Sequence, residues 1–371
     1  MIDAASDRLS RLSGFLEQDP ENPTLLADTV QAALDANALS IADTLVSRLR
    51  LIRPDAFDGK YLAAVAAMRR NDFSSAAAIL RPLVETDGNP NVRFNLAWCE
   101  AMLGNKPVAC ELLDESTITA IAAAAMLKTQ ILHEAGDLAA ALDAGKAALE
   151  IFPDDNGLLA AVATLALDAE DPVLARACAM RAGDHPEALA AAGVLDLQDG
   201  HPDIARVLFD RSLSIRTHNP RAWIGRGLTA LLAQDVPDAA RDIDRGAQQF
   251  GDHIGSWIAA GWAHYLAGDI GAARQRFERA LVIDPNFAEA QGSIAVVALA
   301  EGDKETARRA MVIALRLDRD CFSAALAGIL MTSDDPAKSQ EIVARAMATP
   351  LNDNGLTIAS YMSGLSRATV H

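Results

Sequence analysis

Small residues recur along the chain with a period of 30 to 34 positions. One series of alanines marks this period: Ala42, Ala76, Ala109, Ala141, Ala175, Ala205, Ala239, Ala273 and Ala307. Twelve residues before each alanine stands a second short side chain: Val30, Ala64, Ala97, Thr129, Ala163, Gly193, Gly227, Gly261 and Ala295. Because different residue types recur together at fixed offsets, the pattern indicates an internal structural repeat rather than a biased composition.

A turn signal lies between the two series in each repeat. Four residues before the marker alanine stands an Asp in most repeats, with Ala38, Asn105 or His201 in the others. The residue ahead of it is usually Gly or Asn, as in Asn37, Asn71, Gly104, Gly136, Gly200, Gly268 and Gly302. Gly and Asn accept the left-handed conformation that ends a helix, and Asp or Asn accepts an N–H bond that begins the next helix. Every repeat is therefore predicted as a first helix, a tight turn and a second helix, with small residues where the two helices cross.

The clearest copy of this pattern resembles a tetratricopeptide repeat. In the segment GSWIAAGWAHYLAGDIGAARQRFERALVIDPN, the family's signature spacing is met by Trp257, Gly261, Ala273, Phe277, Ala280 and Pro285. The resemblance implies an all-α fold, an α-α superhelix or solenoid. In this register the first helices are expected to begin near Pro23, Phe57, Pro90, Ala122, Asn156, Pro186, Pro220, Ile254 and Ala288, and in a degenerate tenth repeat near Phe322.

The repeats account for nearly the whole chain. Residues 23–349 are expected to form a solenoid of about ten repeats, of which the one at 156–185 is shortened. Residues 1–22 are expected to hold an N-terminal capping helix with an apolar face of Leu9, Leu12, Phe15 and Leu16, and residues 350–371 a C-terminal capping helix. Caps of this kind cover the end repeats of a solenoid, which would otherwise expose apolar surface. This division leaves no space for a separate catalytic domain.

The charge of the chain restricts its partners. Lys and Arg total 33 against 50 Asp and Glu, a net charge of -17, which disfavours a nucleic acid as partner. Residues 1–185 carry 15 of these cations and 27 of the acids, so the N-terminal half is the more acidic. An acidic solvated surface needs no partner, but it would also attract a basic one.

Several features indicate a cytoplasmic protein. The N-terminus has no signal-peptide pattern, no window is apolar enough for membrane insertion, and the four cysteines show no CxxC spacing. Metal ligands and disulfides are therefore not expected. The cations comprise 27 Arg and 6 Lys beside 75 Ala, a composition typical of a GC-rich bacterial genome.

No catalytic motif stands out. The chain lacks GxGxxG after a strand, GxxxxGK[ST], HExxH and GxSxG, and its histidines are dispersed. We expect no enzymatic activity, no catalytic residue and no cofactor.

The resemblance assigns candidate binding residues. In this family the first helix of each repeat lines a concave groove, and its positions 2, 5, 9, 12 and 13 tend to face that groove. The carried-over set is Phe94, Trp98, Met102, Ile224, Leu228, Leu232, Ile258, Trp262 and Tyr265. Trp223 and Trp257 fall at position 4, which packs between helices. A basic clamp for a partner's C-terminal carboxylate is not expected, since Asn95 and Arg221 are isolated matches to it.

The sequence thus predicts a scaffold or adaptor that binds another protein. The expected ligand is an apolar or amphipathic segment, held in the groove by aromatic and aliphatic anchors. The same groove residues could instead pack against one another, against the chain's own terminus or against a second copy. A role in bacterial assembly or secretion as a chaperone fits the habits of the family. The alternatives are a self-associating structural oligomer and a regulatory subunit of an enzyme encoded elsewhere.

Overall fold

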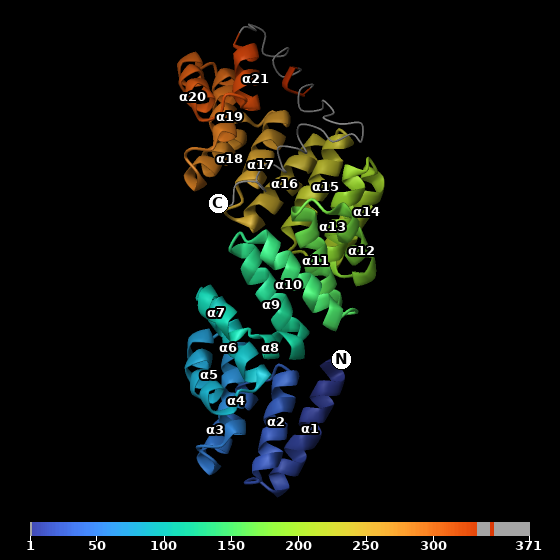
Figure 1. Cartoon of the computed structure of the whole chain (residues 1–371), viewed down its shortest axis with the longest axis vertical. Coiled ribbons are helices and arrows are strands. Elements are labelled where there is room, and N and C mark those ends of the chain that lie inside the picture. Colours follow the sequence, from blue (N-terminus) through green and yellow to red (C-terminus); the bar gives the residue numbers. More distant parts are fainter. Residues whose placement is uncertain (1, 332–341, 345–371) are drawn as a thin grey trace. The chain divides into compact units, whose positions relative to one another are not determined.

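The computed structural model describes residues 2–331 and 342–344, which form helices and turns with no strand among them (Figure 1). An initial helix, α1 (Ile2–Gln18), precedes the repeats. The first helices of the repeats are α2 (Pro23–Asp35), α4 (Phe57–Arg69), α6 (Pro90–Met102), α9 (Ala122–Glu134), α11 (Asn156–Asp168), α13 (Pro186–Gln198), α15 (Pro220–Leu232), α17 (Ile254–Leu266), α19 (Ala288–Ala300) and α21 (Phe322–Leu330). The second helices are α3 (Leu39–Ile52), α5 (Phe73–Asp87), the pair α7 (Lys106–Leu112) and α8 (Glu115–Ala120), α10 (Leu138–Ile151), α12 (Pro172–Ala182), α14 (Pro202–Ile215), α16 (Val236–Phe250), α18 (Ile270–Ile283) and α20 (Lys304–Leu317).

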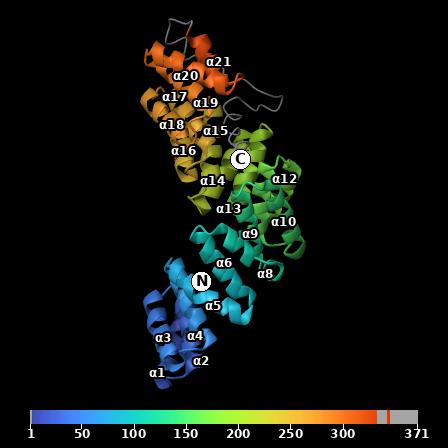
Figure 2. The ribbon, with the colours of Figure 1, turned by 60° about the vertical axis from the view of Figure 1, so that its left-hand side comes forward.

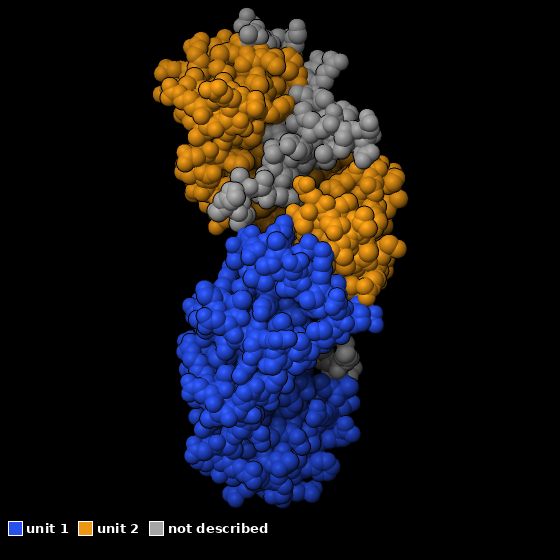
Figure 3. All heavy atoms as spheres, viewed as in Figure 1, with its two compact units in different colours: residues 1–158 blue, residues 159–371 orange. Residues whose placement is uncertain are grey.

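The chain divides into two compact units, residues 1–158 (unit 1) and 159–371 (unit 2), as Figure 3 shows by colour. The division falls inside α11. Within each unit, helices that follow one another in the chain pack side by side (Figures 1 and 2). In unit 2, for example, α17, α19 and α21 lie in one layer and α18 and α20 in a second layer (Figure 1). No helix in the described part of the chain is long and apolar enough to cross a membrane.

Every first helix begins at the residue that the repeat register predicts, from Pro23 in α2 to Phe322 in α21. The turns that follow also agree with the sequence. All seven predicted Asn and Gly residues have a positive φ, between 55° at Asn37 and 84° at Gly104. Two further turns reach the same conformation without Gly or Asn, at Glu170 and Gln234, where φ is 57° and 63°.

Aspartates begin most second helices, as predicted. The side chains of Asp72, Asp137, Asp171, Asp235, Asp269 and Asp303 each accept a hydrogen bond from a backbone N–H in the first turn. The pKa of Asp72 is lowered by its hydrogen bonds from Ser75, which stabilise the ionised carboxylate. Asn105 was expected to cap in the same way and does not, because its amide instead donates to the buried Glu100 carboxylate at 2.8 Å.

Small residues lie at the helix crossings for a steric reason. A Cβ atom on Gly261 would stand 2.3 Å from the ring of Phe277 on α18, and one on Gly227 would stand 2.5 Å from Ile243 on α16. Phe277 and Ile243 are both fully buried. The recurring small position therefore lets a large side chain of the second helix reach the backbone of the first.

One second helix departs from the predicted pattern. The second helix of the third repeat is broken into α7 and α8, with Leu113 and Asp114 between them. Asp114 begins α8 by accepting hydrogen bonds from Ser116 and from the backbone and hydroxyl of Thr117, and it also pairs with Arg93. Although partial burial would raise the pKa of Asp114, these partners lower it. The local sequence Asp-Glu-Ser-Thr thus starts a new helix where the repeat would continue the old one.

The repeat at 156–185 is short because its second helix is short. Helix α12 has 11 residues, against 14 or 15 in its neighbours α10, α14 and α16, and it ends at Gly183 with φ of 59°. At the N-terminus, α1 packs on α2 through Leu9 and Leu16, but Phe15 is 58% exposed rather than part of that contact. The predicted capping helix at 350–371 lies outside the described residues.

Candidate functional site

The first-helix face, defined here as the side chains at repeat positions 5, 9, 12 and 13 of the first helices, holds all the predicted binding residues. In unit 1 these are Phe94, Trp98 and Met102, which follow one another along α6 at one-turn intervals. Phe94 and Trp98 are half-buried and meet edge to face, with 6.4 Å between ring centroids. Met102 is 48% exposed. Helix α6 therefore offers a continuous apolar row that is still accessible to a partner.

Two aromatic residues of the preceding first helix extend this row. Phe57 and Tyr61 on α4 are half-buried, and their rings stack with centroids 5.8 Å apart. The amide of Asn95 on α6 donates to the Tyr61 hydroxyl at 2.9 Å, which ties the two helices together on this face. The candidate set left out Tyr61, although its position 5 in the repeat is the signal that could have included it.

In unit 2 the predicted residues of α15 are also accessible. Ile224 and Leu228 are half-buried, and Leu232 is 45% exposed. At the start of this helix, Arg221 forms an ion pair with Asp168 of α11, with both guanidinium nitrogens within 3.3 Å of Oδ1. Arg221 and Asn95, the two isolated matches to a carboxylate clamp, are thus both engaged within the chain.

The three predicted residues of α17 are not accessible. Ile258 is 1% exposed, and Trp262 and Tyr265 are each 3% exposed, so the expectation that they face an open groove is wrong. Trp262 meets Tyr265 and Phe277 edge to face at 5.6 and 5.5 Å. All three belong to one apolar cluster with Ile294 of α19, Leu326 of α21 and Val343. Their repeat position is as predicted, but other side chains of unit 2 cover it.

Trp223 and Trp257 have the packing role that position 4 predicts. The indole N–H of Trp223 donates to the Thr217 carbonyl, and that of Trp257 donates to the Gly251 carbonyl. Two guanidinium groups also lie over the Trp223 ring, with Arg226 at 4.5 Å and Arg245 at 4.1 Å from its centroid. These contacts fasten the start of each first helix to the preceding loop, and they also link the start of α15 to the second helix that follows it, α16.

Ion pairs join neighbouring helices of unit 2 near the α17 cluster. Arg276 of α18 holds Asp244 of α16 with two hydrogen bonds of 2.8 and 3.0 Å, and His264 Nε2 of α17 lies 3.8 Å from the same carboxylate. Burial by itself would raise the pKa of Asp244, but His264 and Arg276 hold it well below its usual range. Asp244 is therefore a structural anion rather than a proton donor or acceptor near neutral pH.

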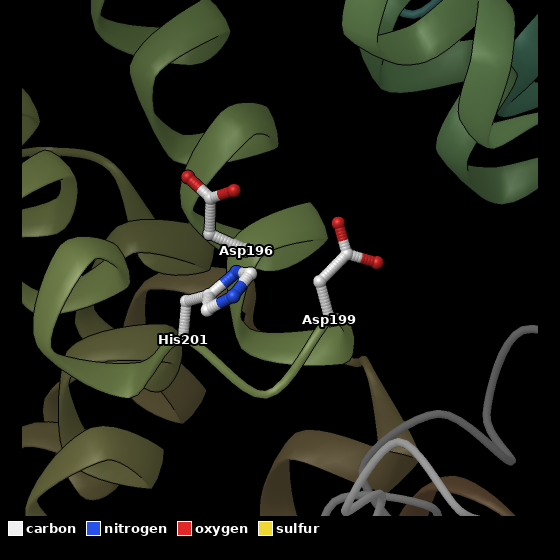
Figure 4. A group of neighbouring side chains, drawn as sticks. All are labelled: Asp196, Asp199 and His201. Atoms are coloured by element: carbon white, nitrogen blue, oxygen red, sulfur yellow. The ribbon is translucent and has the colours of Figure 1, made fainter.

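One group of side chains in the described residues has the spacing of metal ligands. Asp196, Asp199 and His201 gather where α13 ends and the turn leads into α14 (Figure 4). Arg176 of α12 already occupies the two carboxylates, with contacts of 3.0 Å to Asp196 and 2.6 Å to Asp199. A guanidinium that neutralises both aspartates explains the cluster as a link between helices, so the cluster does not identify a metal centre.

The buried thiols are not suited to nucleophilic chemistry. Burial, aided by the neighbouring Glu100, raises the pKa of Cys99 to about 11. Burial raises the pKa of Cys321 to about 12, again with a nearby carboxylate, Glu289. Both thiols stay protonated near neutral pH, and a thiolate is the reactive form.

Comparison with known proteins identifies the repeat. A family described as "Tetratricopeptide repeat" matches residues 61–124 and 258–327. Tetratricopeptide repeat protein 8 of Caenorhabditis elegans is 26% identical over 175 residues, which make up 46% of this chain and 35% of that protein. The chain thus spans about a third of the length of this curated relative.

Three solved structures that align with this chain have TM-scores below 0.5. The APC/C hetero-tetramer Cut9-Hcn1 is 12% identical, with a TM-score of 0.49 over 89% of this chain and 94% of that chain. YrrB, described as a TPR protein with an unusual peptide-binding site, is 18% identical, with a TM-score of 0.41 over 51% of this chain and 99% of its own. Pseudomonas aeruginosa pilF is 16% identical, with a TM-score of 0.45 over 54% of this chain and 94% of its own.

Proposed function

The chain is a tetratricopeptide repeat protein, and we propose that it is a non-enzymatic module that binds an apolar or amphipathic segment of another protein on its first-helix face. The observation that carries the proposal is the accessible row of Phe94, Trp98 and Met102 on α6. Large apolar side chains that stay partly exposed in a row on one helix are typical of binding surfaces.

The row is suited to binding because it is held in place before a partner arrives. The buried parts of Phe94 and Trp98 pack against an apolar cluster that contains Leu127 and Ile131 of α9. Their free edges can therefore be buried by a partner without much loss of side-chain entropy. Covering the exposed part of one such aromatic ring contributes up to roughly 2 kcal/mol at about 25 cal/mol per Å² of apolar surface.

The acidic charge of the chain favours a partner segment that carries basic residues. The excess of acidic residues is largest in the N-terminal half of the chain, which contains α6. A partner segment with basic residues beside its apolar anchors would associate faster at low salt than at high salt.

The proposal is tested with two substitutions that are matched in exposure. Met102 lies on the first-helix face and is 48% exposed, whereas Val108 lies on α7 and is 46% exposed. Met102→Asp is expected to weaken partner binding at least about tenfold, because it places a charge in the apolar contact, while Val108→Asp leaves binding unchanged. The partner is first captured from a lysate with the wild-type chain, and its dissociation constant is then measured for all three chains by calorimetry.

Two results would contradict the proposal. Equal binding by the Met102→Asp and Val108→Asp chains would move the contact away from α6. Sedimentation that shows stable dimers of the wild-type chain, dissociated by Met102→Asp, would show instead that the row joins copies of this chain.

A further inference from the structure

Helix α4 carries a charged side chain at each end of one stripe. Asp58, Tyr61, Val65 and Arg69 follow one another at intervals of three or four residues, so they lie on one side of the helix. Their repeat positions are 2, 5, 9 and 13, and the last three belong to the first-helix face. Tyr61 and Val65 are half-buried, while Asp58 and Arg69 are exposed. The stripe therefore presents an anion, two largely apolar side chains and a cation, in that order from the start of the helix.

This order of charge sets α4 apart from the other first helices that lie wholly in unit 1. The residues at positions 2 and 13 are Thr24 and Asp35 on α2, Asn91 and Met102 on α6, and Ala123 and Glu134 on α9. Asp35 and Glu134 each form an ion pair within the chain. Neither Asp58 nor Arg69 forms an ion pair in the described part of the chain. Both charges of the α4 stripe are thus available to another molecule.

The α4 stripe lies beside the proposed binding row on α6. The amide of Asn95 on α6 donates to the Tyr61 hydroxyl, so the two helices meet on this face. A ligand that covers the row on α6 is therefore within reach of the stripe on α4.

The spacing of the two charges favours a helical ligand. Asp58 and Arg69 stand 11 positions apart on α4, which is about 16 Å along the helix axis. A ligand helix spans the same length in about eleven residues, which are close to three whole turns, so both of its charges lie on one side. An extended segment spans it in about five residues, and side chains five apart point to opposite sides. Only the helix presents both charges and the apolar residues between them to the same surface.

The order of the charges sets the direction of that helix. Acidic residues stabilise the first turn of a helix, and basic residues stabilise its last turn. A ligand helix with this usual order meets Arg69 with its first turn and Asp58 with its last turn only when it runs antiparallel to α4.

From these observations we infer that the ligand of the first-helix face of unit 1 is an amphipathic helix that lies antiparallel to α4. An acidic residue in its first turn pairs with Arg69, and a basic residue in its last turn pairs with Asp58. The inference rests on the proposed function, to which it adds the conformation, the direction and the charge order of the ligand.

The same two charges also suit α4 itself, because Asp58 is in its first turn and Arg69 is in its last turn. That role would make both residues contribute to stability. It would not make them select the direction in which a ligand binds. The direction of binding is therefore the property to measure.

Two synthetic peptides of identical composition serve as probes. Both have about 16 residues, the same leucine stripe and a hydrocarbon staple that keeps them helical. The acid-first peptide has Glu in its first turn and Arg eleven residues later, and the base-first peptide has these two residues exchanged. Fluorescence anisotropy measures the binding of each labelled peptide to the full chain. The wild type is expected to bind the acid-first peptide about threefold to tenfold more tightly, a difference that fades in about 0.5 M salt.

A charge exchange in the chain provides the decisive variant. Asp58→Arg combined with Arg69→Asp keeps the net charge and is expected to invert the preference between the peptides. The control exchange, Asp143→Lys with Lys146→Asp, moves two exposed charges on the second helix α10 and should leave the preference unchanged. If circular dichroism shows that the first exchange unfolds the chain, Asp58→Asn with Arg69→Gln takes its place and should reduce the preference to about one.

Several outcomes would overturn the inference. They are equal affinities of the wild type for the two peptides, a preference that the charge exchange does not alter, and no binding of either peptide. Tighter binding of an unstapled, proline-containing peptide whose charges stand five residues apart would contradict the helical conformation.

Met102→Asp separates these failures from a failure of the proposed function. Equal peptide affinities that this substitution still lowers would retain the apolar contact on α6 and remove only the direction. A clear preference that this substitution leaves at full affinity would place the charges in a binding site and remove α6 from it.

Discussion

Helix α6 of unit 1 and helix α17 of unit 2 carry the same kind of apolar row on the same face of the repeat. On α6, Trp98 packs against a buried apolar cluster with one part of its ring and is accessible to solvent with the rest. On α17, Trp262 is enclosed by Tyr265, Phe277 and the rest of its cluster. The repeat position thus determines which way a side chain points, but its surroundings determine whether it is available. A row that is accessible on α6 is part of the core on α17.

The largest expected effect separates the two tryptophans by stability. Trp262→Ala should lower the free energy of unfolding by about 3 to 5 kcal/mol, as removal of a fully packed aromatic side chain does. Trp98→Ala should lower it by about 1 to 2 kcal/mol, because part of its ring is already in water. Urea unfolding followed by circular dichroism measures both. Similar losses for the two variants would mean that α6 and α17 do not differ as described.

The helix crossing of α17 and α18 gives the next largest effect. Gly261→Leu should cost more than about 2 kcal/mol, because its first added carbon would stand 2.3 Å from Phe277. Gly14→Leu in α1 is the control, since nothing lies within 4 Å of a Cβ there. That change should be neutral or stabilising by up to about 1 kcal/mol, as leucine favours helix more than glycine does. A neutral Gly261→Leu in thermal unfolding would show that the two helices do not cross at this residue.

Acid should weaken unit 2 through Asp244. The pKa of this carboxyl is lowered in the folded chain, so its contribution is fully present above the unfolded value of about 4 and is lost as the pH falls through the folded value. Asp244→Asn should lower stability at pH 7 by about 2 kcal/mol, because Arg276 loses its charged partner, and it should flatten the loss between about pH 4 and pH 2. Urea unfolding midpoints measured across this pH range test whether stability falls as the pH falls. A variant with the same acid slope as the wild type would exclude Asp244 as the cause.

The smallest effect concerns a turn that has glutamine where most other turns have Gly or Asn. Gln234 adopts a positive φ of 63°, which costs a side-chain-bearing residue more than it costs glycine. Gln234→Gly in unit 2 should therefore stabilise the chain by about 0.5 to 1 kcal/mol. The opposite change at an equivalent turn, Gly136→Gln in unit 1, should destabilise it by a similar amount. If Gln234→Gly lowers the melting temperature, strain at this turn is not the controlling factor.

Most of the fold follows from the sequence because its determinants are local. The starts of the first helices, the left-handed turn residues and the Asp caps each depend on a few neighbouring residues, and a fixed period repeats them along the chain. The predictions of local structure that are wrong also have local causes. Asp114 interrupts a second helix because its side chain caps a new one. Glu170 and Gln234 adopt a positive φ that their residue types do not predict.

The candidate site is predictable only in part. Repeat position correctly places Phe94, Trp98 and Met102 together on α6, and Ile224, Leu228 and Leu232 together on α15. It cannot show that Ile258, Trp262 and Tyr265 are buried, because burial depends on side chains of other helices, such as Phe277 on α18, which meets Trp262 edge to face. Nor does it show that Arg221 is already paired with Asp168, which precedes it by 53 residues.

The most direct test measures the accessibility of Trp98 and Trp262 in one sample of the full-length chain. Hydroxyl-radical footprinting gives a separate oxidation rate for each residue. The expected result is fast oxidation of Trp98 and Met102 and slow oxidation of Trp262 and Tyr265, with Trp98 and Met102 becoming protected when the captured partner is added. Equal rates for the two tryptophans in the free chain, or no protection of α6 by the partner, would contradict a binding face that is open on α6 and covered on α17.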